Sequence, residues 1–210
     1  MRKKKRKNFV FVLLLLLCLI IPFSSILAFA YVPSGHIFSD GSPVGYYYVN
    51  NSVGNAPCGV SYTNLINDAA AGWNNSGAGC QFTKTTGSTY KIYVKTGNFG
   101  NSGYSGKTLF YNSSSRNITD SGGSPTANYA YTIITLNDDE FDRYSSTLGG
   151  KNVVGSIVTH ELVHSLVLKH SSAGTPYPIM LGALGDKIIK REITYYKPQG
   201  DDVFGVSMIY

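Results

Sequence analysis

The chain has 210 residues, of which 18 are Lys or Arg and 12 are Asp or Glu, so its formal net charge is +6. Six of the basic residues lie at positions 2–7, directly before an apolar run over residues 9–21. Residues 1–30 therefore have the layout of a secretory signal peptide that ends at Ala30. Without this segment, the chain has 12 basic and 12 acidic residues. Its charge therefore does not argue for nucleic-acid binding.

Residues 31–210 are enough for one domain with its own core. The alternative to cleavage after residue 30 is an uncleaved membrane anchor, but the apolar run is short for a membrane span. We therefore expect a secreted protein with no stable membrane association after the signal peptide is removed. Cys58 and Cys80 remain after cleavage. An even pair in an oxidising compartment is a candidate disulfide, and two free thiols are the alternative.

The predicted elements alternate between strands and helices. An irregular N-terminal arm covers residues 31–43. Composition and alternation predict strands over residues 44–50, 90–95, 108–112 and 130–137. Apolar residues at helical spacing predict an amphipathic helix over residues 62–73, and the pair Asp201-Asp202 marks the start of a short closing helix. The order of these elements indicates an α/β fold.

A longer helix is predicted before the closing one, and it carries the pattern His-Glu-x-x-His from His160 to His164. Two histidines four residues apart project from the same face of a helix, which suits two ligands of a tetrahedral zinc ion. Glu161 lies beside the first ligand, where it could accept a proton from water activated by the metal. The alternative is an amphipathic helix whose histidines have no metal.

The third ligand requires a change of chain direction. On an unbroken helix, His170 would lie about 240° around from His164 and could not reach the metal. We therefore expect the helix to stop between Leu166 and Lys169. Val167 is β-branched and poorly suited to a left-handed turn. An alternative third ligand is Glu192, as in thermolysin-like enzymes.

An acidic stretch over residues 137–142 follows the last predicted strand. Its oxygen atoms could contribute to a calcium site, with Glu140 as a candidate ligand. A solvated acidic turn is the alternative interpretation.

The segment from Leu136 to Tyr210 resembles the catalytic core of the matrixin-type metzincins, which are zinc endopeptidases that include the matrix metalloproteinases and shorter bacterial relatives. Four pieces match in order. They are the acidic stretch 137–141, the motif with its exit at 160–172, Met180 at the position of the family's Met-turn, and the closing segment 199–210. Val167 stands where the family motif has Gly.

The resemblance implies an α/β fold in which a twisted, mostly parallel five-stranded sheet packs on two long helices, with a short C-terminal helix. It implies that His160, His164 and His170 bind Zn²⁺, that Glu161 is the general base, and that Met180 shapes the floor of the site. Residues 31–210 would then be a single zinc metalloprotease domain.

The function expected from the sequence is a secreted, monomeric zinc endopeptidase that acts on a protein or peptide substrate. The second hypothesis is a non-catalytic, zinc-stabilised binding module that lost activity through Val167. The intact Glu161 favours the enzyme, because a binding module has no evident need for the base.

Overall fold

The computed structural model describes residues 31–50, 53–57, 59–142, 150–166, 168–171, 178–182 and 196–210. Four sets of residues from the sequence predictions lie outside the described residues. They are the signal segment 1–30, Cys58, Val167 and Glu192.

The described elements are a series of short strands and four helices. In chain order they are β1 (Val32–Pro33), β2 (Val44–Val49), α2 (Tyr62–Asn74), β3 (Gln81–Lys84), β4 (Ile92–Gly97), β5 (Gly106–Tyr111), β6 (Tyr131–Asn137), α3 (Asp138–Asp142), α4 (Gly150–His164), β7 (Leu168–Lys169) and α6 (Gly200–Ser207). The predicted strands and helices all have counterparts among these. β1, β3, β7 and α3 were not predicted.

The main sheet has five strands in the order β3-β2-β4-β6-β5. β2 pairs with β3 and β4 in parallel, and β4 pairs with β6 in parallel. β5 pairs antiparallel to β6 and forms one edge of the sheet. β1 and β7 form a separate antiparallel pair.

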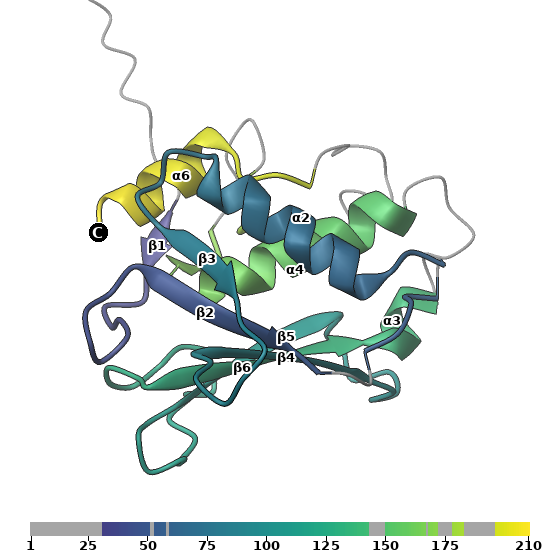
Figure 1. Ribbon diagram of the computed structural model, residues 1–210, viewed down its shortest axis with the longest axis horizontal. Helices are drawn as coiled ribbons and strands as arrows, with labels where there is room; N and C mark the ends of the chain where they lie inside the picture. Colours follow the sequence, from purple (N-terminus) through teal and green to yellow (C-terminus); the bar gives the residue numbers. More distant parts are fainter. Residues whose placement is uncertain are drawn as a thin grey trace, which may run out of the picture.

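The helices α2 and α4 lie side by side over one face of the main sheet (Figure 1). The buried face of α2 carries Leu65, Ile66 and Trp73, as the helical spacing predicts. The indole Nε1 of Trp73 donates a hydrogen bond to the carbonyl of Thr159, at 3.0 Å. The core between the sheet and α2 therefore also fixes the position of α4, just before its first histidine.

The predicted metzincin-like fold class needs correction. The described chain has two sheets rather than one, each with an antiparallel pairing, and α3 adds a fourth helix. β5 is antiparallel because the chain returns from it to β6 through a loop, without the helical crossover that parallel neighbours need. The two-residue strands β1 and β7 have too few residues to show a sequence period.

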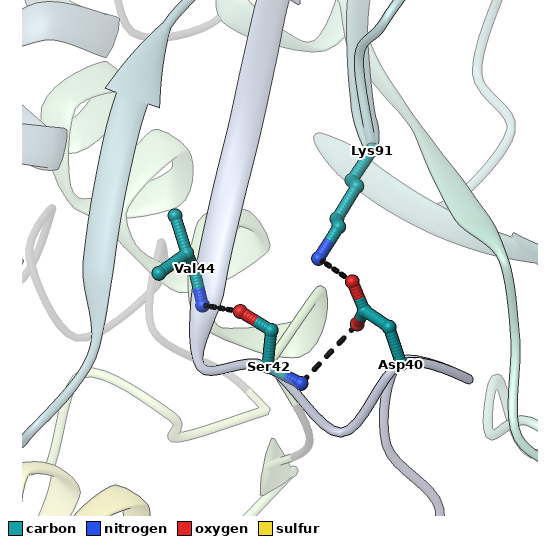
Figure 2. A network of polar contacts seen from close by, with 4 residues as sticks. All are labelled: Asp40, Ser42, Val44 and Lys91. Atoms are coloured by element: carbon teal, nitrogen blue, oxygen red, sulfur yellow. Dashed lines mark hydrogen bonds and ion pairs between the residues drawn. The ribbon is translucent and has the colours of Figure 1, made fainter.

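The segment before β2 is held by polar contacts that Figure 2 shows. The Lys91 ammonium lies 2.5 Å from the Asp40 carboxylate. The same carboxylate accepts a hydrogen bond from the Ser42 N–H, and the Ser42 hydroxyl accepts one from the Val44 N–H. The hydrogen bond from Lys91 lowers the pKa of Asp40. These contacts join the N-terminal arm to the residue just before β4.

Within the part of the chain that the structure describes, no helix is both long and apolar enough to cross a membrane.

Candidate metal centre

The three histidines of the motif come together at the C-terminal end of α4. The rings of His160 and His164 have centroids 4.5 Å apart, and the ring of His170 lies 5.1 Å and 4.9 Å from them. One ligand atom from each histidine lies within 4.8 Å of the other two. Among the described residues, no other group of three or more potential metal ligands lies this close together.

His170 reaches the other two rings because α4 ends at His164. This end is two residues earlier than the earliest expected stop. Leu166 donates its N–H to the carbonyl of Val163, at 2.9 Å, which tightens the last turn. The chain then enters β7, whose pairing with β1 directs it back towards the helix end.

Backbone carbonyls orient two of the three rings. His160 Nδ1 lies 2.7 Å from the carbonyl oxygen of Ile179, and His164 Nδ1 lies 2.6 Å from that of Leu168. A carbonyl oxygen only accepts hydrogen bonds, so both Nδ1 atoms carry the proton and both Nε2 atoms are left with a free lone pair. This arrangement is typical of metal-binding histidines.

The electrostatics of the three rings also suit a cation. Burial, together with the neighbouring His170, lowers the pKa of His160 to about 4. Burial also lowers the pKa of His164 and that of His170. The three imidazoles are therefore neutral near pH 7, which is the form that binds a metal. Three neutral imidazole ligands with one open side fit Zn²⁺ in a catalytic site.

Glu161 lies beside this cluster and is 5% exposed. Burial raises its pKa to about 7, against a smaller opposing effect of the Thr108 hydroxyl. That hydroxyl donates a hydrogen bond of 2.7 Å to the Glu161 carboxylate. A carboxylate with a pKa near neutrality can both take up and release a proton at physiological pH.

Gly106 makes room for Glu161 on β5. A Cβ atom at position 106 would lie 2.7 Å from the Glu161 side chain. Sequence reasoning placed residues 108–112 in a strand but assigned no role to Gly106 or Thr108. The contacts cross more than fifty positions of sequence, and no local pattern signals them.

Met180 lies on a buried turn, directly after Ile179, and is 1% exposed. The carboxylate of Asp202, also 1% exposed, accepts the N–H groups of Ile179 and Met180 at 2.8 and 3.1 Å. Ile179 in turn provides the carbonyl that orients His160. Sequence reasoning recognised Asp202 as a residue at the start of a helix, but not as the support of this turn.

A cleft of about 470 Å³ opens beside the cluster. Glu161, His164 and His170 line it, together with β5 and the loop 117–125. The backbone of Phe110 faces that loop, because its N–H donates to Thr119 and its carbonyl accepts from Ile118. By the two-residue alternation of an antiparallel pair, the backbone groups of Thr108 and Gly106 point in the same direction, away from β6.

The acidic stretch after β6 forms α3 and makes contacts within the protein. Asn137 is buried, and its amide donates hydrogen bonds to Gly100, Ser102 and Tyr104 while accepting one from the Phe99 N–H. Among the described residues, no carboxylate of this stretch belongs to a group of potential metal ligands. The Ca²⁺ site, with Glu140 as ligand, stays a prediction.

Three further predictions concern residues outside the described part of the chain. Cys80 is buried and has no disulfide partner among the described residues, and burial raises the pKa of its thiol to about 11. Its expected disulfide partner Cys58 is not described, so the disulfide also stays a prediction. The same holds for Glu192 as a third ligand and for the turn at Val167.

Comparisons with known proteins support similarity at the level of the fold. No protein-family model matches the chain. No curated protein matches it either. Among solved structures, it is similar to a chain of "GM1 bound form of the ECX AB5 holotoxin", with a TM-score of 0.54 and 16% sequence identity. The match covers 86% of this chain and 88% of that one.

These findings correct the assignment to the matrixin-type metzincins. No family model supports it, and a solved structure of similar fold is described as an AB5 holotoxin. At 16% identity, the similarity shows a shared fold and nothing about activity. The sequence resemblance misled because the most specific of its four pieces is a short metal-binding motif, and such a motif can occur on unrelated folds.

Proposed function

We propose that this protein is an exported zinc-dependent endopeptidase. The observation that carries the proposal is a cluster of three histidines, two of them oriented by backbone carbonyls, with a buried carboxylate beside it and a cleft that Glu161, His164 and His170 line. His160, His164 and His170 would hold the ion. The bound zinc would supply Lewis acidity towards the scissile carbonyl and towards the attacking water.

Glu161 performs the proton transfers in this proposal. Its carboxylate takes a proton from the attacking water, and it then gives that proton to the nitrogen of the leaving amine. In the metal-free protein, burial raises the pKa of this carboxyl to about 7, which supports its role as the group that accepts the proton. Thr108 holds the carboxylate towards the cleft.

The edge of the main sheet supports an extended peptide as the substrate. β5 is an edge strand, and the backbone groups of Gly106 and Thr108 point away from β6, towards the side that has no strand partner in this sheet. An extended peptide can pair with such an edge through its own backbone. Its scissile bond would then lie in the cleft that Glu161, His164 and His170 line.

The test compares the purified chain with its Glu161→Gln variant on an unbiased peptide library, with zinc content measured on both. We expect both proteins to contain zinc and the variant to lose about 10²- to 10⁴-fold in cleavage rate, the usual contribution of a general base. Zinc in both proteins without cleavage by either would contradict the enzyme and favour the binding module. Equal cleavage by both would remove Glu161 from the mechanism.

Export belongs to the same proposal. It rests on the signal-peptide layout of residues 1–30, with Ala28-Phe29-Ala30 before the expected cleavage point.

A further inference from the structure

A turn at Ser165 and Leu166 follows α4, between the second and the third histidine. The last carbonyls of a helix lack partners within the helix, and many helices satisfy them by closing on a glycine. No glycine lies between His164 and His170. The turn that delivers the third imidazole must therefore be stabilised by other groups.

Two tyrosine hydroxyls provide this stabilisation. Tyr129 donates a hydrogen bond to the carbonyl of Ser165, at 2.8 Å, and Tyr210 donates one to the carbonyl of Leu166, at 3.2 Å. Both carbonyls lie in the turn that follows α4. The two donors come from distant parts of the chain, one just before β6 and the other at position 210.

Tyr129 is held rigidly for this contact. It is fully buried, and its ring packs against Phe38 and Phe110, each with centroids 4.8 Å away. Its backbone carbonyl accepts the N–H of Ser39, and its N–H donates to the carbonyl of Ile37. The hydroxyl therefore has a defined position before any metal binds.

Ser165 is fixed a second time through its side chain. The hydroxyl of Thr132, on β6, donates to the hydroxyl of Ser165 at 2.9 Å. Just beyond the turn, Leu168 pairs with Pro33 and provides the carbonyl that orients His164. Ser165 is thus held by β6 of the main sheet, and Leu168 is held by β1 and contacts the candidate ligand His164.

We propose that Tyr129 and Tyr210 are positioning residues that hold the turn between His164 and His170, so that the third imidazole meets the other two. This inference rests on the metal-binding part of the proposed function. It does not depend on peptide cleavage. Neither tyrosine contacts substrate in this role, and both act through the backbone that carries His170.

The experiment measures zinc affinity by competition with a chromophoric chelator at pH 8. The variants are Tyr129→Phe, Tyr210→Phe, their combination, and His170→Ala as the reference for a site with two histidines. Tyr47→Phe is the matched control, because it also removes a tyrosine hydroxyl that donates a hydrogen bond, to Asn67 at 2.9 Å, but away from the cluster. Phenylalanine keeps each ring and its packing.

We expect each of the two variants to weaken zinc binding about 10-fold, the lower end of the loss found when a supporting contact of a ligand is removed. The combined variant should approach His170→Ala, and Tyr47→Phe should bind zinc as the unchanged chain does. The visible spectrum of the Co²⁺-substituted protein should shift in the combined variant, since it reports coordination geometry, which a general loss of stability does not alter.

Unchanged zinc affinity and an unchanged Co²⁺ spectrum in both single variants, together with a loss in His170→Ala, would overturn the role of the tyrosines while leaving the proposed function intact. A chain that binds no zinc at all would overturn both. If the combined variant does not fold, the single variants decide the question.

Discussion

At the scale of single residues, Thr108 contacts the proposed general base Glu161, although no sequence motif includes Thr108. Its hydroxyl lies 2.7 Å from the Glu161 carboxylate, and both side chains are buried. A hydrogen bond to a buried charged group is worth about 1.5–3 kcal/mol. Thr108 therefore both orients Glu161, the proposed general base, and stabilises its ionised form.

Replacing Thr108 by Val should lower kcat about 10- to 100-fold with little change in KM, because the shape is kept while the hydrogen bond to the base is lost. Thr108→Ser keeps the hydroxyl and should retain most of the activity. Steady-state kinetics on one peptide substrate checks both variants. A loss of equal size in the Ser variant would show that packing at position 108, and not the hydroxyl, matters.

Glu161 should also make the free energy of unfolding of the metal-free protein depend on pH. Its folded-state pKa is about 7, against an ordinary value of 4.5, so the folded chain retains the proton between these two pH values. Stability from this group is therefore greatest below pH 4.5 and is lost as the pH rises through 7. Glu161→Gln has no such dependence.

Relative to the unchanged chain, metal-free Glu161→Gln should gain about 2–3 kcal/mol in free energy of unfolding between pH 4.5 and pH 8. Urea unfolding in the presence of a chelator measures this difference. A constant difference across the range would mean that the carboxyl group is not desolvated in solution.

At the scale of elements, the turn at Met180 depends on α6 rather than on its own sequence. Asp202 lies in the first turn of α6 and accepts three backbone N–H groups, from Ile179, Met180 and Gln199. Because Ile179 orients His160, α6 supports the metal site without contributing a ligand.

Asp202→Asn should therefore lower the free energy of unfolding by about 1–3 kcal/mol, since one of the two oxygens becomes an amide that faces N–H donors. It should also weaken zinc binding. Chemical unfolding and chelator competition test the two effects. Asp201→Asn, at the neighbouring position, provides the comparison, and an equal effect of both variants would contradict a specific role for Asp202.

Some elements were predictable from local patterns and others were not. The helix over 62–73 and the strands at 44–50, 90–95 and 130–137 fall within a few residues of the observed α2, β2, β4 and β6. Their apolar residues follow a clear period. β3 has only one buried residue, Phe82, so its period could not show. The residues of α3 allowed two interpretations, a calcium site or a solvated acidic turn, but no helix was predicted because five residues show no helical period.

At the scale of the whole molecule, the N-terminal end of the described chain packs against α6. The rings of Tyr31 and Phe204 lie 5.7 Å apart, and a Cβ at Gly205 would lie 2.7 Å from that of Tyr31. Residue 31 is also the first residue after the expected signal cleavage site. The proposed mature chain would thus begin at a residue that belongs to the folded domain.

Expression with residues 1–30 in a secreting bacterial host should release a protein whose first residue is Tyr31. N-terminal sequencing of the protein from the medium checks this prediction. A protein that stays with the membrane fraction and retains residues 1–30 would support the uncleaved anchor instead.

The sequence by itself indicated two candidate donors, His160 and His164, with Glu161 beside the first, and left His170 and Glu192 as candidates for the third. A spacing of four residues on one helix, with a glutamate beside the first histidine, is a local property that backbone geometry translates directly into positions. It also indicated that the helix has to end before His170. It did not determine the family, because a motif of this length specifies metal geometry and not the rest of the fold.

Only the tertiary structure decided how the site is supported. Thr108 on β5, Tyr129 before β6, Asp202 on α6 and the terminal Tyr210 reach the site from segments far apart in the sequence. Such contacts carry no period and no fixed spacing, because they arise where separate elements pack against one another. The motif thus names the ligands, whereas the packing of the whole chain sets the positions from which they can act.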